Sequence, residues 1–163
     1  MEPDLKPPIL PIAVLVAALA LPAAAADVSC PDLSGAAQVA ECPGEEELRH
    51  TFHGYCGSDA QAYKGDTGVC TDYRNYRRIK NVALWESADG AFSAYVSCDR
   101  APAEVKAARV SSLRVARQGK ISLVTCSYGE GLNFTLRSRA ECRLDGAAAA
   151  CASDAAACKA ACD

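Results

Sequence analysis

The chain has 163 residues, a formal net charge of −3 and ten cysteines. The small charge excludes the strongly charged composition of a disordered chain, and its slightly acidic sign argues against nucleic acid as a partner. Residues 27–163 hold only 22 Ile, Leu, Val and Phe side chains, about 16 % of the segment, a level at which a core is thin. We therefore expect a domain stabilised by up to five disulfides.

Residues 9–26 form an apolar run, ILPIAVLVAALALPAAAA, that ends in small residues. Ala24 and Ala26 fit the A-x-A rule for signal-peptide cleavage. The alternative is a membrane anchor, but the run is short for a span and contains Pro11 and Pro22. We predict a signal peptide over residues 1–26 and a mature protein in the periplasm or outside the cell, with no stable membrane span after cleavage.

The first part of the mature chain, up to residue 78, is expected to be irregular. Residues 34–42 favour a short helix, which Pro43 and Gly44 would end. Residues 44–52 place acidic residues before basic ones, which suits a helix dipole. Residues 53–70 are rich in Gly, Asp and Ser and predict a loop with a cysteine near each end.

The core is expected in residues 79–136, which hold 15 of the 22 large apolar side chains. Alternating apolar and polar residues predict strands separated by turns, with a short helix over residues 101–109. In the last strand apolar side chains alternate with Asn133, Thr135 and Arg137. The sequence predicts a five-strand antiparallel meander with one solvated face, its strands at residues 81–87, 91–98, 110–117, 121–128 and 132–138.

The tail, residues 145–163, is rich in alanine and favours a helix. On a helix Cys151, Cys158 and Cys162 fall within about 40° of one another, so we expect this helix to be clamped to the body by disulfides. Since three is an odd number, at least one of these cysteines should pair outside the tail. The predicted fold class is mainly β (α+β): a stapled meander over residues 27–144 with a short Ala/Cys-rich helix docked on it.

The pairing of the cysteines cannot be deduced, because ten cysteines allow about 945 connectivities. The prediction is that all of them are oxidised: Cys30, Cys42, Cys56, Cys70, Cys98, Cys126, Cys142, Cys151, Cys158 and Cys162.

The two histidines of the chain lie together in HTFHGYC. His50, His53 and Cys56 have a spacing that could offer ligands to zinc or copper. The alternative is a pair of surface histidines beside a disulfide, and an oxidised Cys56 could not serve as a thiolate ligand. A metal-handling protein or small enzyme that uses His50 and His53 stays open as an alternative, although no cofactor is expected.

The segment DYRNYRRIK, residues 72–80, has four cations and two tyrosines. Such a run could hold a polyanion through arginine contacts, with the tyrosine rings as flat surfaces. The alternative is a solvated helix or loop with its tyrosines on the core. Arg114, Arg137 and Arg139 could extend a basic patch across the solvated face of the sheet. The candidate ligand-binding residues are Tyr73, Arg74, Tyr76, Arg77, Arg78 and Lys80.

Several sequence motifs of catalytic sites are missing, whereas a pair of catalytic carboxylates stays open because its separation in space cannot be deduced from the sequence. It has no C-x-x-C pair, no G-x-S-x-G elbow and no H-E-x-x-H. The predicted function is therefore a non-catalytic binding or structural role, with an anionic envelope component or a protein as partner. An accessory subunit of a periplasmic complex is a further alternative.

Two short motifs carry a resemblance to known proteins. SCP at residues 29–31 and CSY at residues 126–128 resemble an early Cys-Pro and a late C-x-Y strand in uncharacterised families of small exported bacterial proteins. The resemblance implies export, and it implies no activity. The small subunit of methylamine dehydrogenase is similar in size and cysteine content, but its quinone cofactor is built from two tryptophans and this chain has only Trp85.

Overall fold

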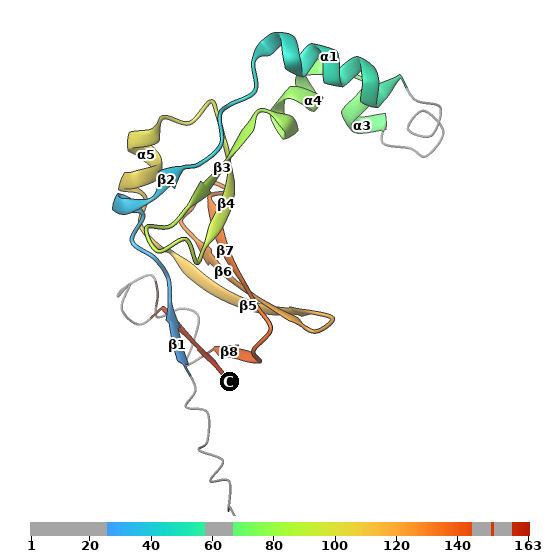
Figure 1. Ribbon diagram of the computed structural model, residues 1–163. Helices are drawn as coiled ribbons and strands as arrows, with labels where there is room; N and C mark the ends of the chain where they lie inside the picture. Colours follow the sequence, from blue (N-terminus) through green and yellow to red (C-terminus); the bar gives the residue numbers. More distant parts are fainter. Residues whose placement is uncertain (1–25, 58–66, 145–150, 152–157) are drawn as a thin grey trace, which may run out of the picture.

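The computed structural model describes residues 26–57, 67–144, 151 and 158–163 (Figure 1). Its strands are β1 (Ala26–Ser29), β2 (Ala37–Gln38), β3 (Val82–Glu86), β4 (Ser93–Ser97), β5 (Ser112–Gln118), β6 (Ile121–Ser127), β7 (Asn133–Ser138), β8 (Cys142–Leu144) and β9 (Lys159–Cys162). Its helices are η1 (Leu33–Gly35), α1 (Glu45–Cys56), α3 (Thr67–Cys70), α4 (Tyr73–Lys80) and α5 (Pro102–Ala107). The fold is mainly β, as predicted.

The larger sheet has six strands in the order β2-β3-β4-β7-β6-β5, and all its pairs are antiparallel. The five predicted strands are present, but the predicted meander is wrong. After β4 the chain crosses over through α5, and β5, β6 and β7 then follow as hairpins that bring β7 beside β4. This is a Greek-key order. The long connection through α5 removes the constraint that a tight turn would place on the next strand.

The predicted C-terminal helix is not confirmed. Residues 145–150 and 152–157 lie outside the described part of the chain, and residues 159–162 form strand β9. β9 lies between β1 and β8 in a second, three-stranded sheet. The pairing of Cys162 with Cys142 places the tail alongside β8. A backbone held there satisfies its hydrogen bonds by strand pairing, which overrides the helix preference of alanine.

Five disulfides staple the chain, and no cysteine is free. The prediction that all ten cysteines are oxidised is therefore confirmed, as is the pairing of at least one tail cysteine outside the tail. The bridges are Cys30–Cys126, Cys42–Cys98, Cys56–Cys70, Cys142–Cys162 and Cys151–Cys158.

The core covers one face of the larger sheet. Alternate residues of its strands are buried, such as Trp85 on β3 and Phe134 on β7, while their neighbours are more exposed. Leu33 of η1 and Val105 of α5 close this face, and both are fully buried in the same cluster. The prediction that Asn133, Thr135 and Arg137 point away from the core is confirmed, because Phe134 and Leu136, which alternate with them, pack in or against the core cluster.

The segment before the core differs from the sequence interpretation. Residues 34–42 do not form the expected helix: after η1 the chain adds β2 to the edge of β3. The expected helix at residues 44–52 is present as α1 and is longer, because it continues into the predicted loop as far as Cys56. Residues 58–66 of that loop lie outside the described part of the chain. The disulfide from Cys56 to Cys70 then joins α1 to α3.

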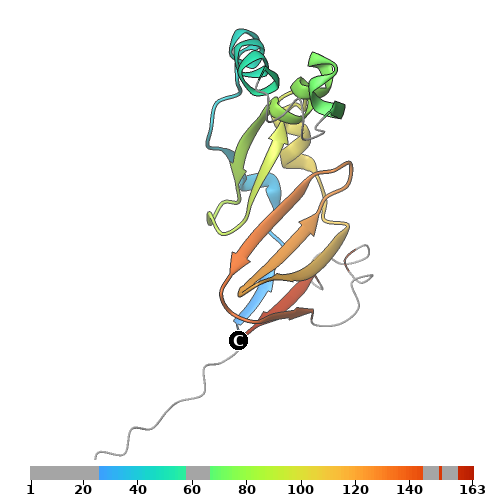
Figure 2. The ribbon, with the colours of Figure 1, turned by 90° about the vertical axis from the view of Figure 1, so that its right-hand side faces the viewer.

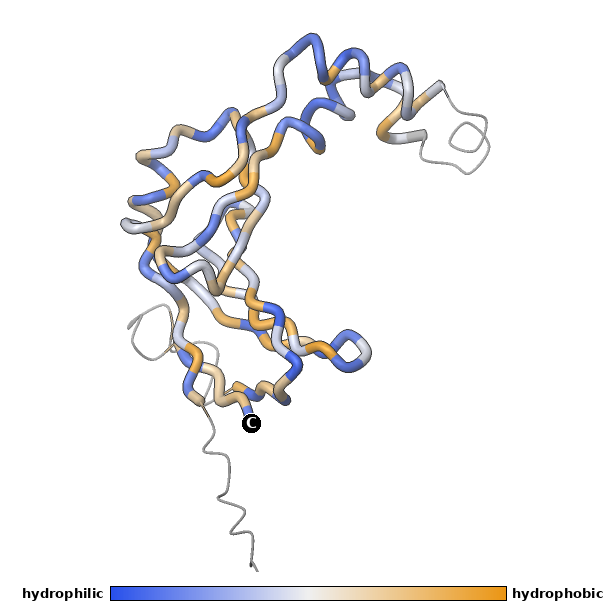
Figure 3. Tube along the Cα trace, in the orientation of Figure 1, coloured by the Kyte–Doolittle hydropathy of each residue, from blue (hydrophilic) through white to orange (hydrophobic). Residues whose placement is uncertain are grey.

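Helices α1, α3 and α4 form an arm that projects from one end of the larger sheet (Figures 1 and 2). The arm is largely hydrophilic (Figure 3). It is fixed to the sheet by the disulfide from Cys42 to Cys98 and by Asp99, which accepts hydrogen bonds from Arg77 and Asn81. In Figure 1 α5 lies on one side of the strands, and the arm and the β5–β6 turn extend toward the other. The other face of the sheet, which no described helix covers, therefore looks toward the side to which the arm and the β5–β6 turn extend.

Candidate functional site

Helix α4 carries the basic residues that the sequence selected, and its start is fixed locally. Asp72 caps the helix by accepting a hydrogen bond from the amide of Arg74. The Arg74 guanidinium returns to the same carboxylate, with Nη2 at 2.8 Å from Oδ2. These hydrogen bonds from Arg74 lower the pKa of Asp72. Arg74 is thus already paired with a carboxylate of its own chain.

Arg77 is paired more extensively. Its Nη1 and Nη2 donate to the two oxygens of Asp99 at 2.9 and 3.0 Å, and its Nε donates to Glu45 at 3.3 Å. The hydrogen bonds from Arg77 lower the pKa of Asp99. A bidentate carboxylate pair occupies the donor geometry that an external phosphate or carboxylate would need.

The two tyrosines of α4 pack against α1 within the arm. Tyr76 is buried, and its ring packs against Phe52 with centroids 5.3 Å apart. The Tyr73 hydroxyl donates to Glu45 at 2.9 Å, and the Arg49 guanidinium lies over the Tyr73 ring. For these two side chains the geometry agrees with the alternative interpretation, a solvated helix with tyrosines on the core of the arm.

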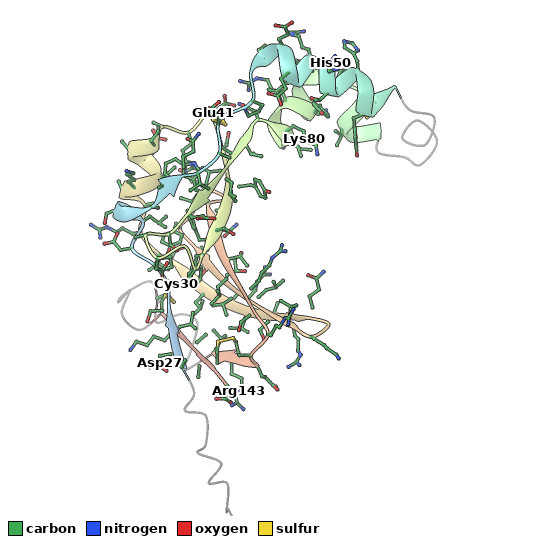
Figure 4. All side chains as sticks on the ribbon, viewed as in Figure 1. Asp27, Cys30, Glu41, His50, Lys80 and Arg143 are labelled. Atoms are coloured by element: carbon green, nitrogen blue, oxygen red, sulfur yellow. A yellow bond between two sulfur atoms is a disulfide. The ribbon has the colours of Figure 1, made fainter. Side chains whose placement is uncertain are left out.

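Arg78 and Lys80 are the remaining cations of the predicted set. Both are exposed, and within the described residues neither has a carboxylate in ion-pair distance. The Lys80 ammonium lies 5.6 Å from the centre of the Tyr55 ring, on the underside of the arm (Figure 4). The six predicted residues therefore share a helix without forming one free basic surface.

The two histidines lie on α1, where both are exposed. His50 points outward from the arm (Figure 4). Cys56 is bonded to Cys70 and so cannot supply a thiolate. In the described part of the chain, no three His, Cys, Asp or Glu residues gather as a metal site would require.

A second group of polar side chains lies on the uncovered face of the larger sheet, which we call the open face. Its members are the outward residues of β4, β5, β6 and β7. Thr125 and Thr135 are paired across strands, with hydroxyls 3.2 Å apart, and Ser127 donates to Asn133 at 2.7 Å. The open face comprises Ser93, Tyr95, Ser112, Arg114, Thr125, Ser127, Asn133, Thr135 and Arg137.

The open face contains two hollows of about 490 and 480 Å³ that share Asn133 and Thr135. The first includes Arg114, and the second includes Arg137 and Tyr95. These volumes lie in the range of small ligand sites. Together their linings reach from Leu84 on β3 to Arg114 on β5, across five neighbouring strands.

The cations of the open face are available to a ligand. Arg114 and Arg137 are exposed, and no described carboxylate lies in ion-pair distance of either. Tyr95 is 75 % exposed, more than any other large hydrophobic side chain among the described residues. The sequence interpretation named both arginines but missed Tyr95. The alternation of SAYVS could have identified Tyr95, because it directs Tyr95 and the buried Val96 to opposite faces of the strand.

Comparisons with protein-family models, curated proteins and solved structures give no match to this chain. The resemblance to small exported bacterial proteins therefore stays an expectation. Within the described residues, no helix combines the length and the apolar character that crossing a bilayer requires.

Proposed function

We propose that this chain is an exported, non-catalytic binding protein that holds an anionic partner on its open face. The observation that carries the proposal is the placement of Arg114 and Arg137, two arginines without described carboxylate partners, at hollows lined by hydroxyl and amide groups. Guanidinium groups bind carboxylate and phosphate oxygens, and neighbouring hydroxyls add hydrogen bonds.

An acidic residue of the neighbouring strand β3 borders the open face. Glu86 of β3 lies opposite Ser93 on the same side of the sheet, but it does not line either hollow. An acidic group would therefore be attracted to the β5–β7 side of the sheet and repelled from the β3 side. This gradient gives the bound partner an orientation.

The predicted signal peptide and the five disulfides support a periplasmic or secreted location. Disulfides persist in oxidising compartments and are rare in the cytosol. An envelope polyanion is the kind of partner that such a location supplies.

The test is binding to a soluble polyanion, alginate or polyphosphate, at low salt. The double variant Arg114→Glu/Arg137→Glu should bind roughly tenfold more weakly, since two charge-assisted contacts become repulsive. The matched control, Arg78→Glu/Lys80→Glu, makes the same change of charge on α4 and should leave binding unchanged. If only the α4 variant loses binding, the site lies on the helix; if neither does, the proposal fails.

A further inference from the structure

The larger sheet splits between β4 and β7. The two strands are paired only at Ser93 and Thr135. Continued register would place Tyr95 opposite Asn133, and Ser97 opposite Gly131, but no such pairs form between these described residues. Figure 2 shows the two strands diverging from their one point of contact.

The main-chain groups on both sides of this split point into it. Cys98 donates to Asn81 and Ser87 donates to Phe92, so the even-numbered residues of β4 bond toward β3. Because neighbouring residues of a strand direct their N–H and C=O groups to opposite edges, Tyr95 directs its groups toward β7.

The same reasoning applies to β7. Tyr128 donates to Leu132, so the even-numbered residues of β7 bond toward β6 and Asn133 directs its main chain toward β4. Tyr95 and Asn133 thus present strand edges to each other across the split. An edge with unpaired donors and acceptors is a template for another strand.

Hollows follow the split on both sides of Tyr95. The hollow of about 480 Å³ includes Ser93, Asn133 and Arg137, and a smaller one of about 80 Å³ continues past Tyr95 to Ser97 and Gly131. Along β4 this distance is four residue steps, about 13 Å at the rise of a strand. The space matches a short extended segment in length.

We propose that an extended, acidic polypeptide segment binds in this split and pairs with the free edge of β4 at Tyr95. This inference rests on the proposed function and names the class of its anionic partner. A polypeptide offers N–H and C=O groups at the spacing that the strand edge repeats, which a polysaccharide or polyphosphate does not. Main-chain pairing would supply affinity, and side-chain contacts would supply specificity.

The positive charge beside the split favours an acidic segment. Arg137 lines the hollow of about 480 Å³ and Arg114 lies on the same face, both without a described carboxylate partner. At the far end of the split Glu130 is paired with Arg100. Tyr95 extends from β4 into solvent and can cover a side chain of the added strand.

The experiment measures the affinity of the full mature protein for a blocked hexapeptide of alternating valine and glutamate. Two further forms of the peptide carry N-methyl groups, one on the valine amides and one on the glutamate amides, at unchanged charge. At least one methylated form should bind roughly tenfold more weakly, because it loses main-chain hydrogen bonds. Equal binding of all three forms would overturn the inference.

Variants at Tyr95 provide the matched test from the protein side. Tyr95→Ala and Tyr95→Pro both remove the ring, but only proline removes the N–H group that faces the split. Tyr95→Pro should bind the unmethylated peptide roughly tenfold more weakly than Tyr95→Ala. If the proline variant does not fold, the methylated peptides with the native protein still decide the matter.

Failure of this inference is distinguishable from failure of the proposed function. A protein that binds alginate or polyphosphate through Arg114 and Arg137, but does not bind the peptide, overturns the polypeptide partner and keeps the anionic site. A protein that binds neither polyanion nor peptide overturns both.

Discussion

At the scale of single residues, Arg77 ties the arm to the sheet. It joins Glu45 of α1 to Asp99, which follows β4, and Asp99 also accepts a hydrogen bond from Asn81. Because this pairing lowers the pKa of Asp99 from its ordinary value of 3.8, it stabilises the folded state above that pH. The contribution disappears as the pH falls through the lowered pKa, where the carboxyl becomes protonated in the folded state also.

The variant Arg77→Met should therefore unfold at lower urea concentration than the native protein at pH 7. The gap between their midpoints should narrow when the same measurement is made at about pH 2, since the native protein then lacks the ion pair too. Arg78→Met is the control and should leave both midpoints unchanged. Coinciding midpoints for Arg77→Met and the native protein at pH 7 would show that the arm does not depend on this contact.

At the scale of elements, the arm depends on a small set of contacts. Leu48 and Tyr76 are its described buried hydrophobic residues, and Phe52 packs against the rings of Tyr73 and Tyr76. A helix of the length of α1 is marginal by itself in water. The disulfide from Cys56 to Cys70 therefore contributes much of the stability of α1.

Replacing this bridge, as Cys56→Ser/Cys70→Ser, should destabilise the arm by about 3 kcal/mol, the expected value for a loop of this size. Amide hydrogen exchange should show lost protection in α1 and unchanged protection in β6. Cys151→Ser/Cys158→Ser is the control, because that bridge is remote from the arm in sequence, and α1 should keep its protection. Equal loss in α1 and β6 would mean that arm and sheet unfold as one unit.

Elements with strong local patterns were predictable from the sequence. The five strands of residues 81–138 alternate in polarity, and α5 begins with a proline suited to the first turn of a helix. Their order was not predictable, because the pairing of β7 with β4 depends on contacts between residues far apart in sequence. The tail shows the same effect, since pairing with β1 and β8 overrides the preference of alanine.

The candidate site was predictable only in part. The basic pattern of α4 was clear, but the partners of Arg77 lie 22 and 32 residues away in sequence, at Asp99 and Glu45. The ion pairs that occupy Arg77 form only when folding brings these carboxylates beside it. Arg114 and Arg137 could be placed on the solvated face by alternation, whereas the hollows between strands required the sheet order.

At the scale of the whole molecule, the disulfides form one framework that connects both sheets and the arm. The mature protein should show no thiol that reacts with an alkylating agent before reduction. Its intact mass should be lower than that of the reduced chain by ten hydrogen atoms, two for each of the five bridges. Uptake of two or more alkyl groups without reductant would contradict the framework, and their location at Cys56 would revive the metal-binding alternative.

The pairing of β1 with β9 has a consequence for how the protein is made. Asp27, the first residue after the predicted cleavage point, is paired with Ala161. Strand β1 therefore cannot pair until a partner 134 residues later has been made, roughly 7 to 27 s at ordinary rates of synthesis. Cys30 likewise waits for Cys126, which lies 96 residues away, while Cys42 is available much earlier. An oxidase that joined cysteines in the order in which they emerge would pair Cys30 with Cys42 first, and that bridge would have to be exchanged before the Cys30–Cys126 bridge could form.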